Sequence, residues 1–332
     1  MTQRGPGEHL DPLASTGIPV AHRPEAGPIA ILPEEREPFL SAVKAGGGVV
    51  APLSAETRGL LWLGSDAAEL IAVLRAHPAI GWVQLQWAGV DGMAAALAEY
   101  ADDDSPIWTS AKGAYSEPVA EHALALMLAV LRGLPEKTRS HSWASPATGI
   151  SLFGRTVVIV GAGGIAVELI RLLAPFDVSV TIVRRTPGEL AGADRVVTVD
   201  RLAEVLPDAD VLVVAAAATD STAMLIGAPE LALMKPSAAL VNIARGSLVD
   251  SMALAAALER GQLAGAGLDV TSPEPLPDGH PLWSAPRVVI TSHSADTKEM
   301  VEPLLAERLR LNVAAFLHDG AFIGVVDPGA GY

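Results

Sequence analysis

Apolar runs typical of buried strands alternate with helical stretches along most of the chain. In the first half, four short runs predict strands at residues 29–33, 59–64, 80–87 and 107–110. The stretch 66–77, between the second and third runs, has a helical pattern. Strands that alternate with helices favour a parallel sheet with helical crossovers.

Residues 116–134, SEPVAEHALALMLAVLRGL, form the longest strongly helical stretch. Ser116 can cap its start, and Gly133 suits its end. A second alternating series begins at Thr156, and its predicted strands lie at residues 157–160, 178–183, 211–216, 238–244, 265–270 and 287–291. Helix-like segments follow the first four of these strands, so the series predicts one complete doubly wound domain.

The two series together predict an α/β protein with two doubly wound, parallel-sheet domains and a cleft between them. Residues 1–27 are rich in proline, glycine and charge, and they predict a loose N-terminal arm. We assign residues 28–115 with 296–332 to one domain and residues 116–295 to the other. The amphipathic stretch 300–320 predicts a final helix.

Composition narrows the classes of function. Half of the 332 residues are hydrophobic and 18% are charged, as in a compact globular protein. The net charge of −15 opposes binding to nucleic acid or to an anionic membrane surface. The absence of cysteine excludes disulfides, thiolate metal sites and cysteine nucleophiles.

No feature of the chain points to export or to a membrane. The first residues lack the apolar core of a signal peptide. The longest apolar runs, such as 211–218, are far shorter than the roughly 18 residues needed to span a bilayer. We therefore expect a cytoplasmic protein.

The stretch VVIVGAGGIA contains a candidate phosphate-binding turn. Gly161, Gly163 and Ala166 match G-x-G-x-x-G/A between a predicted strand and a predicted helix. The first glycine permits the turn, the second lets pyrophosphate approach the backbone, and the free N–H groups of Gly164 and Ile165 lie at the start of the helix. A glycine-rich turn in an α/β fold without nucleotide would have the same pattern, but the strand and helix around it favour dinucleotide binding.

The next strand ends in two arginines, in the stretch TIVRRTP. Arg184 occupies the position, about 20 residues after the glycines, where an acidic residue usually binds the ribose of NAD. A guanidinium group pairs instead with phosphate oxygens, and Arg185 and Thr186 add further donors. We therefore predict NADP as the preferred cofactor and NAD as a possible one, although ordinary solvated arginines at a strand end would look the same.

Three later stretches each place one chemically capable side chain after a predicted strand. They are LVNIARGSLVD with Arg245, GAGLDVTSPEPLP with Glu274, and VVITSHSADT with His293. The carboxyl ends of parallel strands border the ligand crevice of an open sheet, so these side chains could converge. Taken singly, each has an ordinary explanation as a loop, turn or capping residue.

At this point the chain resembles the D-isomer-specific 2-hydroxyacid dehydrogenases, which include glyoxylate/hydroxypyruvate reductases and have two Rossmann-like domains. The resemblance covers residues 80–297. The motifs that carry it are WAGVDG, VAEHALALML, GAGGIA, NIARG, LDVTSPEPLP and SHSA, in the family's order.

The resemblance implies a role for each motif. His293 would be the acid/base, Glu274 its carboxylate partner and Arg245 the substrate anchor. Residues 28–115 with 296–332 would bind the substrate, and 116–295 the dinucleotide. A homodimer through the helix 116–134 is also implied. The expected substrate is a small 2-keto acid such as glyoxylate or hydroxypyruvate; its carboxylate would meet Ala88, Gly89 and Val90, and further cofactor contacts would come from Ala216, Ala244 and Asp269.

The chemistry is consistent with these roles. Reduction of a 2-keto acid requires a hydride at C2 and a proton on the carbonyl oxygen, which an imidazolium can deliver near neutral pH. A neighbouring carboxylate favours the charged imidazole and fixes which ring nitrogen faces the substrate. An arginine can bind the substrate carboxylate at two points.

Some residues depart from the family pattern, and other functions stay open. Ser292 stands where the family often has proline, and Thr271 and Ser272 replace frequent aromatic or acidic residues. A dinucleotide sensor or corepressor would keep Gly161, Gly163 and Arg184 without needing the catalytic residues, and a methyltransferase would also have a glycine-rich turn. His122 is interpreted as a helix-face or interface residue, and no histidine pair has metal-ligand spacing.

Overall fold

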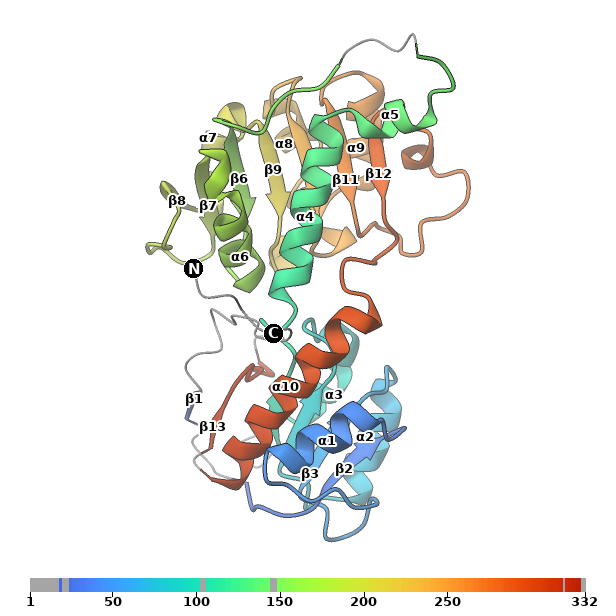
Figure 1. Ribbon diagram of the computed structural model, residues 1–332, viewed down its shortest axis with the longest axis vertical. Coiled ribbons are helices and arrows are strands. Elements are labelled where there is room, and N and C mark those ends of the chain that lie inside the picture. The colour runs from blue at the N-terminus through green and yellow to red at the C-terminus, as the bar shows by residue number, and fades with distance from the viewer. Residues whose placement is uncertain (1–17, 20–23, 102–105, 144–147, 319, 330–332) are drawn as a thin grey trace. The chain divides into compact units, whose positions relative to one another are not determined.

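The computed structural model describes residues 18–19, 24–101, 106–143, 148–318 and 320–329 (Figure 1). The chain forms two compact units. The first unit comprises Met1–Tyr115 and Thr297–Tyr332, and the second unit is the continuous segment Ser116–Asp296. The end of the second unit at Asp296 lies one residue from the domain boundary predicted between 295 and 296.

The second unit is built on a seven-stranded sheet in which all neighbouring strands are parallel. The strand order is β12-β11-β10-β9-β6-β7-β8. Helices cover both faces of such a sheet, which explains why every residue of β9, β10 and β11 is buried. The strands are β6 (Thr156–Val160), β7 (Ser179–Arg184), β8 (Arg195–Thr198), β9 (Val211–Val214), β10 (Ala239–Asn242), β11 (Gly265–Leu268) and β12 (Val288–Ile290).

Two groups of helices flank this sheet. Helix α4 packs on α6, β10 and β11, whereas α8 packs on α9. Figure 1 shows α4 in front of the strands and α8 and α9 behind them. Close packing of α4 requires a glycine at position 267, since a Cβ there would lie 2.8 Å from Cβ of Leu126. The helices are α4 (Ser116–Leu131), α5 (Leu134–Arg139), α6 (Gly164–Leu173), α7 (Leu202–Val205), α8 (Ala228–Leu233) and α9 (Ser251–Glu259).

Strand β8 was not predicted, and the helix expected between the second and third predicted strands of this series is α7, which begins at Leu202, after β8. The chain turns after β7 and returns as β8 at the edge of the sheet. An edge strand buries only part of its surface, and Arg195 is exposed. The four residues RVVT therefore lack the continuous apolar run of the central strands.

The first unit contains a four-stranded parallel sheet in the order β2-β3-β4-β5. Val50 forms a parallel bridge with Ile29 at the other edge of β2, so the connections run in both directions from β2, as in a doubly wound sheet. Helix α1 packs on α10, and α2 packs on α3. The elements are β2 (Ile29–Leu32), α1 (Glu37–Ala45), β3 (Gly59–Trp62), α2 (Ala67–Ala76), β4 (Trp82–Leu85), α3 (Ala94–Glu99), β5 (Ile107–Thr109) and α10 (Lys298–Leu317).

Helix α10 completes the core of the first unit. The ring of Trp82 lies 5.1 Å from that of Phe316 and 5.6 Å from that of Phe322, measured between centroids. Buried Asn312 donates a hydrogen bond of 2.8 Å to the side-chain oxygen of Gln84. The C-terminal segment is thus part of the same core as β4.

Part of the predicted loose arm is paired. Strand β1 (Ile18–Pro19) pairs antiparallel with β13 (Ala321–Phe322). Residues 1–17 and 20–23 of the arm lie outside the described residues. In the part of the chain that the structure describes, no helix combines the length and the apolar character needed to cross a bilayer.

Candidate active site

His293 and Glu274 meet at the carboxyl ends of β12 and β11. The imidazole Nδ1 lies 2.6 Å from Oε1 of Glu274, and both side chains are about two-fifths exposed, at 43% and 40%. The backbone N–H of His293 donates to the carbonyl oxygen of Asp269 at 2.6 Å. Because Nδ1 faces the carboxylate, Nε2 is the ring nitrogen that remains for another partner.

The turn that carries His293 has an unusual backbone. Ser292 has φ of 50° and His293 has φ of 55°, so two successive residues are left-handed. Proline cannot adopt this conformation, because its ring holds φ near −65°. A proline at position 292 would therefore be incompatible with this turn.

Asp269 lies directly after β11 and organises the chain around His293. Its side chain is only 2% exposed, and Oδ1 accepts hydrogen bonds from the Thr291 hydroxyl at 2.6 Å and the Ser294 N–H at 2.8 Å. Oδ2 accepts from the Ala295 N–H at 3.2 Å. Burial acts to raise the pKa of Asp269, but interactions with His122, Thr291 and Ser294 outweigh it and lower the pKa to about 2. The predicted contact of Asp269 with the cofactor stays a prediction.

Arg245 lies on the loop after β10, the neighbour of β11. Asn242 fixes this loop, because its side-chain amide donates to the Arg245 carbonyl oxygen at 3.0 Å while its side-chain oxygen accepts from the Ala244 N–H at 3.2 Å. The Asn242 carbonyl oxygen also accepts from the Asp269 N–H at 2.9 Å. The ends of β10 and β11 are thus joined by hydrogen bonds.

Gly246 lets the Arg245 loop touch the loop that leads to Glu274. A Cβ at position 246 would lie 1.8 Å from the Thr271 carbonyl oxygen, which is backbone and cannot move away. Asp296 adds an electrostatic link: burial raises its pKa, although interactions with His293 and Arg245 both act to lower it. Both side chains therefore lie close enough to influence the same carboxylate.

The phosphate turn fits a dinucleotide. Gly161 has φ of 118°, and a Cβ there would lie 2.5 Å from the Ala215 carbonyl oxygen. Gly163 precedes the first turn of α6, and a Cβ there would meet nothing within 4 Å. Gly164 and Ile165 begin the helix, so their backbone N–H groups have no acceptor within the helix and are available to a pyrophosphate.

Arg184 is the last residue of β7 and is partly buried. Its guanidinium makes no hydrogen bond or ion pair with the residues that the structure describes. Arg185 and Thr186 follow it and are exposed. Ala216 follows β9 and Ala244 follows β10, so both lie at the same edge of the sheet as the phosphate turn.

The predicted carboxylate loop belongs to the first unit. Ala88, Gly89 and Val90 follow β4, with Val90 buried and Ala88 and Gly89 partly exposed. Trp87 before them is 47% exposed. This loop lies at the carboxyl edge of its own parallel sheet.

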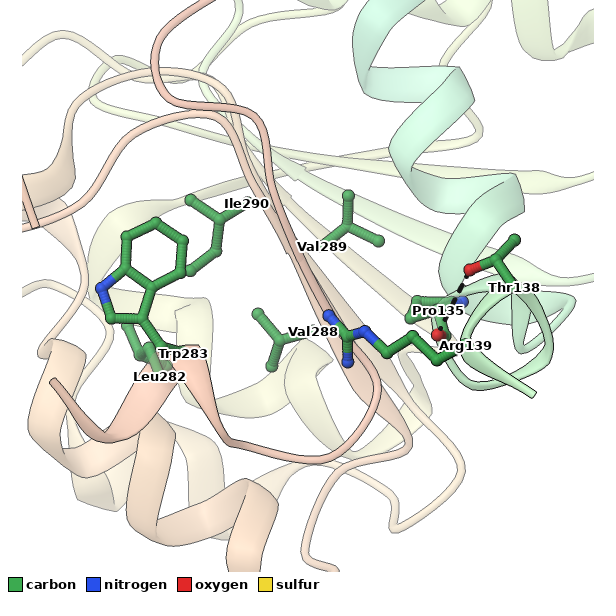
Figure 2. Close-up of a pocket in the computed structure, with 8 residues that line it drawn as sticks. All are labelled: Pro135, Thr138, Arg139, Leu282, Trp283, Val288, Val289 and Ile290. Atoms are coloured by element: carbon green, nitrogen blue, oxygen red, sulfur yellow. Dashed lines mark hydrogen bonds between the residues drawn. The ribbon is translucent and has the colours of Figure 1, made fainter. Parts of the chain in front are cut away.

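A cavity of about 230 Å³ lies beside β12 in the second unit (Figure 2). Figure 2 shows Trp283, Leu282 and Ile290 on one side of it and Arg139 and Thr138 on the other. The indole N–H of Trp283 donates to the Pro277 carbonyl oxygen at 3.0 Å. None of the predicted catalytic or cofactor residues lines this cavity. The described residues also contain no group of three histidine or acidic side chains that could bind a metal.

Comparison with known proteins decides the family. The family described as D-isomer specific 2-hydroxyacid dehydrogenase, NAD binding domain, matches residues 124–295, which is more than half of the chain. The chain belongs to this family. As a D-isomer-specific 2-hydroxyacid dehydrogenase family member, it is an oxidoreductase linked to a nicotinamide dinucleotide, and its substrate class is 2-hydroxy or 2-keto acids.

Three similar proteins illustrate the relationship. An uncharacterised protein of Corynebacterium melassecola is 37% identical over 76% of this chain and 84% of its own length. A glyoxylate reductase of Pyrococcus furiosus is 34% identical over 63% of this chain, and the match spans 65% of that enzyme. The structure of a D-isomer-specific 2-hydroxyacid dehydrogenase of Xanthobacter autotrophicus, in complex with NADPH and MES, has a TM-score of 0.78 at 26% identity, covering 93% of this chain and 100% of that one. The predicted α/β class, with Rossmann-like parallel sheets flanked by helices, is therefore confirmed.

Three residues of the site in this dehydrogenase family member, Asn242, Thr291 and His122, were not predicted from the sequence to lie there. Asn242 ends the apolar strand β10 and Thr291 directly follows the apolar strand β12, and that pattern could have marked them. His122 was interpreted as a helix-face or interface residue, and the structure places its Nε2 2.8 Å from the Thr291 hydroxyl oxygen. No sequence pattern connects residues that are 169 positions apart.

Proposed function

We propose that this protein reduces a small 2-keto acid, such as glyoxylate or hydroxypyruvate, with NADPH as the preferred hydride donor. The observation that carries the proposal is the 2.6 Å contact between His293 and Glu274 beside the Arg245 loop. The glyoxylate reductase of P. furiosus and the NADPH complex from X. autotrophicus support the substrate class and the cofactor.

His293 is the proposed proton donor. With Nδ1 held by Glu274, the imidazolium keeps a proton at Nε2 and gives it to the carbonyl oxygen of the substrate as negative charge develops there. Glu274 stabilises the charged ring and fixes its orientation. In the direction of oxidation, the same nitrogen removes the hydroxyl proton.

Arg245 is the proposed anchor for the substrate. Its guanidinium can bind the carboxylate through two parallel hydrogen bonds and polarise the neighbouring carbonyl. Asn242 and Gly246 hold the loop that presents it. Binding of the substrate carboxylate by the backbone N–H groups of Ala88, Gly89 and Val90 stays a prediction from the sequence.

The residues present fit a dinucleotide. When bound, the cofactor supplies the hydride that reaches C2 of the substrate. Gly161, Gly163, Gly164 and Ile165 would hold its pyrophosphate, and Ala216 and Ala244 would border it. Arg184, Arg185 and Thr186 would bind the 2′-phosphate, which is why we favour NADPH over NADH.

The deciding experiment measures NADPH oxidation against a panel of 2-keto acids, with NADH in parallel. We expect turnover of glyoxylate or hydroxypyruvate, with a higher kcat/KM for NADPH. His293→Gln should lower kcat by roughly 10²–10⁴-fold, because a positioned acid contributes that much, and should leave NADPH binding nearly unchanged.

Two outcomes would contradict the proposal. A fully active His293→Gln variant would remove this residue from the mechanism. Tight NADPH binding without turnover of any 2-keto acid would instead favour a dinucleotide sensor. Arg245→Ala serves as a further check, since loss of the anchor should raise KM for the keto acid.

Two properties stay predictions from the sequence. A homodimer through α4 is supported by Leu124 and Leu128, which lie one turn apart and are only partly buried. The cytoplasmic location stays a prediction as well.

A further inference from the structure

His122 connects the long helix α4 to the ends of β11 and β12. It lies in the second turn of α4, with its side chain 22% exposed. Its Nε2 is 2.8 Å from the Thr291 hydroxyl oxygen and 3.4 Å from Oδ1 of Asp269. The imidazole therefore reaches the same carboxylate that holds the turn of His293.

The hydrogen-bond inventory fixes the direction of this contact. A threonine hydroxyl has a single proton, and Thr291 donates it to Oδ1 of Asp269 at 2.6 Å. Its oxygen can only accept from His122, so Nε2 of His122 carries a hydrogen and is the donor. The chain of donation runs from His122 to Thr291 to Asp269.

Asp269 in turn holds the backbone on both sides of the proton donor. Its carbonyl oxygen accepts from the His293 N–H, and its carboxylate accepts from the N–H groups of Ser294 and Ala295. Left-handed backbone at Ser292 and His293 costs free energy for a non-glycine residue and persists only where the surroundings enforce it. The hydrogen bonds that Asp269 accepts from the N–H groups of His293, Ser294 and Ala295 enforce this conformation.

We propose that His122 is a positioning residue for His293, acting through Thr291 and Asp269, a role that rests on the proposed function of His293. The ring donates to Thr291, Thr291 orients the Asp269 carboxylate, and the carboxylate keeps the turn in the conformation that directs Nδ1 of His293 toward Glu274. His122 does not touch substrate or cofactor in this role. Its loss loosens the turn and leaves the phosphate turn unchanged.

The kinetic test compares His122→Phe, which keeps the bulk of the ring but removes the donor, with His122→Gln, whose amide can replace Nε2. We expect His122→Phe to lower kcat about tenfold with less than a twofold change in the Kd for NADPH, and His122→Gln to restore most of the rate. His141→Gln, at an exposed histidine of the same unit, is the matched control and should behave as the wild type.

A double-mutant cycle separates this chain of contacts from a general loss of packing. Thr291→Val should lower kcat by a similar factor, and the double variant His122→Phe/Thr291→Val should fall little further, because both changes break one pathway. Independent, multiplicative losses would overturn the proposal. So would a His122→Gln variant that is no better than His122→Phe.

A spectroscopic test does not depend on activity. The proton on Nδ1 of His293, hydrogen-bonded to Glu274, should give a downfield NMR signal in the cofactor-bound protein, assigned by its loss in His293→Gln. We expect the signal to persist in His122→Gln and to broaden or vanish in His122→Phe and Thr291→Val. An unchanged signal in His122→Phe and Thr291→Val would overturn the proposal. This test is independent of the proposed function, because the signal can be recorded even if the wild type reduces no 2-keto acid. If His122→Phe does not fold, Thr291→Val decides.

Discussion

The buried carboxylate of Asp269 accepts hydrogen bonds from Thr291, Ser294 and Ala295. These contacts exist only in the folded chain, so they favour the ionised form of Asp269 in the native state alone. Its folded pKa of about 2 lies below the ordinary value of 3.8. Folding therefore gains stability from this group at neutral pH.

The pH dependence of stability follows from the sign of this shift. Because the unfolded chain binds the proton first, the contribution of Asp269 is fully present above about pH 4 and is lost as the pH falls toward 2. The shift corresponds to about 2 kcal/mol at pH 7. Urea unfolding should show Asp269→Asn less stable than the wild type at pH 7, with a clearly smaller difference near pH 3.

The control for this prediction lies elsewhere in the chain. Asp278→Asn, in the turn after Glu274, should leave the difference from the wild type small at both pH values. A constant gap between the wild type and Asp269→Asn from pH 7 to pH 3 would contradict the assigned role of the Asp269 charge.

The approach of two side chains could be predicted from the sequence where both follow parallel strands that end at the same edge of the sheet. Glu274 and His293 were predicted to approach because parallel strands end at one edge, and the two side chains do meet. The left-handed turn at Ser292 and the contact of His122 with Thr291 could not be predicted. Both depend on hydrogen bonds between segments far apart in the chain, which leave no periodic pattern.

At the level of secondary structure, burial on both faces made the central strands predictable. Strands such as β9, VLVV, are continuous apolar runs because helices cover both sides of the sheet. Strand β8 lies at the edge and lacks this signature. Helix α4 ends at Leu131 rather than at residue 134, and Gly133 with φ of 61° separates it from α5.

The end of β7 determines the expected choice of cofactor. Arg184 ends this strand beside two exposed donors, Arg185 and Thr186. Arg184→Asp should raise the Kd for NADPH by about 10–100-fold, equivalent to about 1.4–2.8 kcal/mol, because a phosphate would then face a carboxylate. Affinity for NADH should change little or improve. Fluorescence titration with both cofactors measures this directly.

The neighbouring strand offers a matched control. Arg195 begins β8 and pairs with Thr181, which lies three residues before Arg184 on β7. Arg195→Asp therefore makes the same change of charge, but toward the opposite end of the two strands. It should affect the two cofactors equally. Equal losses of NADPH and NADH affinity in Arg184→Asp would show that this arginine does not read the 2′-phosphate.

In the whole molecule, the chain passes twice between the two units, at residues 115–116 and 296–297. The second unit is one continuous segment, whereas the first unit needs its C-terminal part to complete its core. Leu309, Val313 and Phe316 of α10 are fully buried. The two units therefore differ in how far each depends on the end of the chain.

A chain that ends at Asp296 tests this asymmetry. Removal of α10 and β13 takes away the rings that pack on Trp82, so β4 loses apolar cover. It also takes away Asn312, one of the two side chains that donate a hydrogen bond to the buried side-chain oxygen of Gln84. Hydrogen exchange should show that β2–β5 lose their protection while β6, β9 and β10 stay protected. NADPH should still bind with a Kd within about threefold of that of the full chain, because the proposed cofactor contacts all lie between residues 161 and 269. Loss of protection throughout residues 116–296 would mean that the second unit cannot fold without the first, and retained protection of β2–β5 would mean that α10 is not required for the first core.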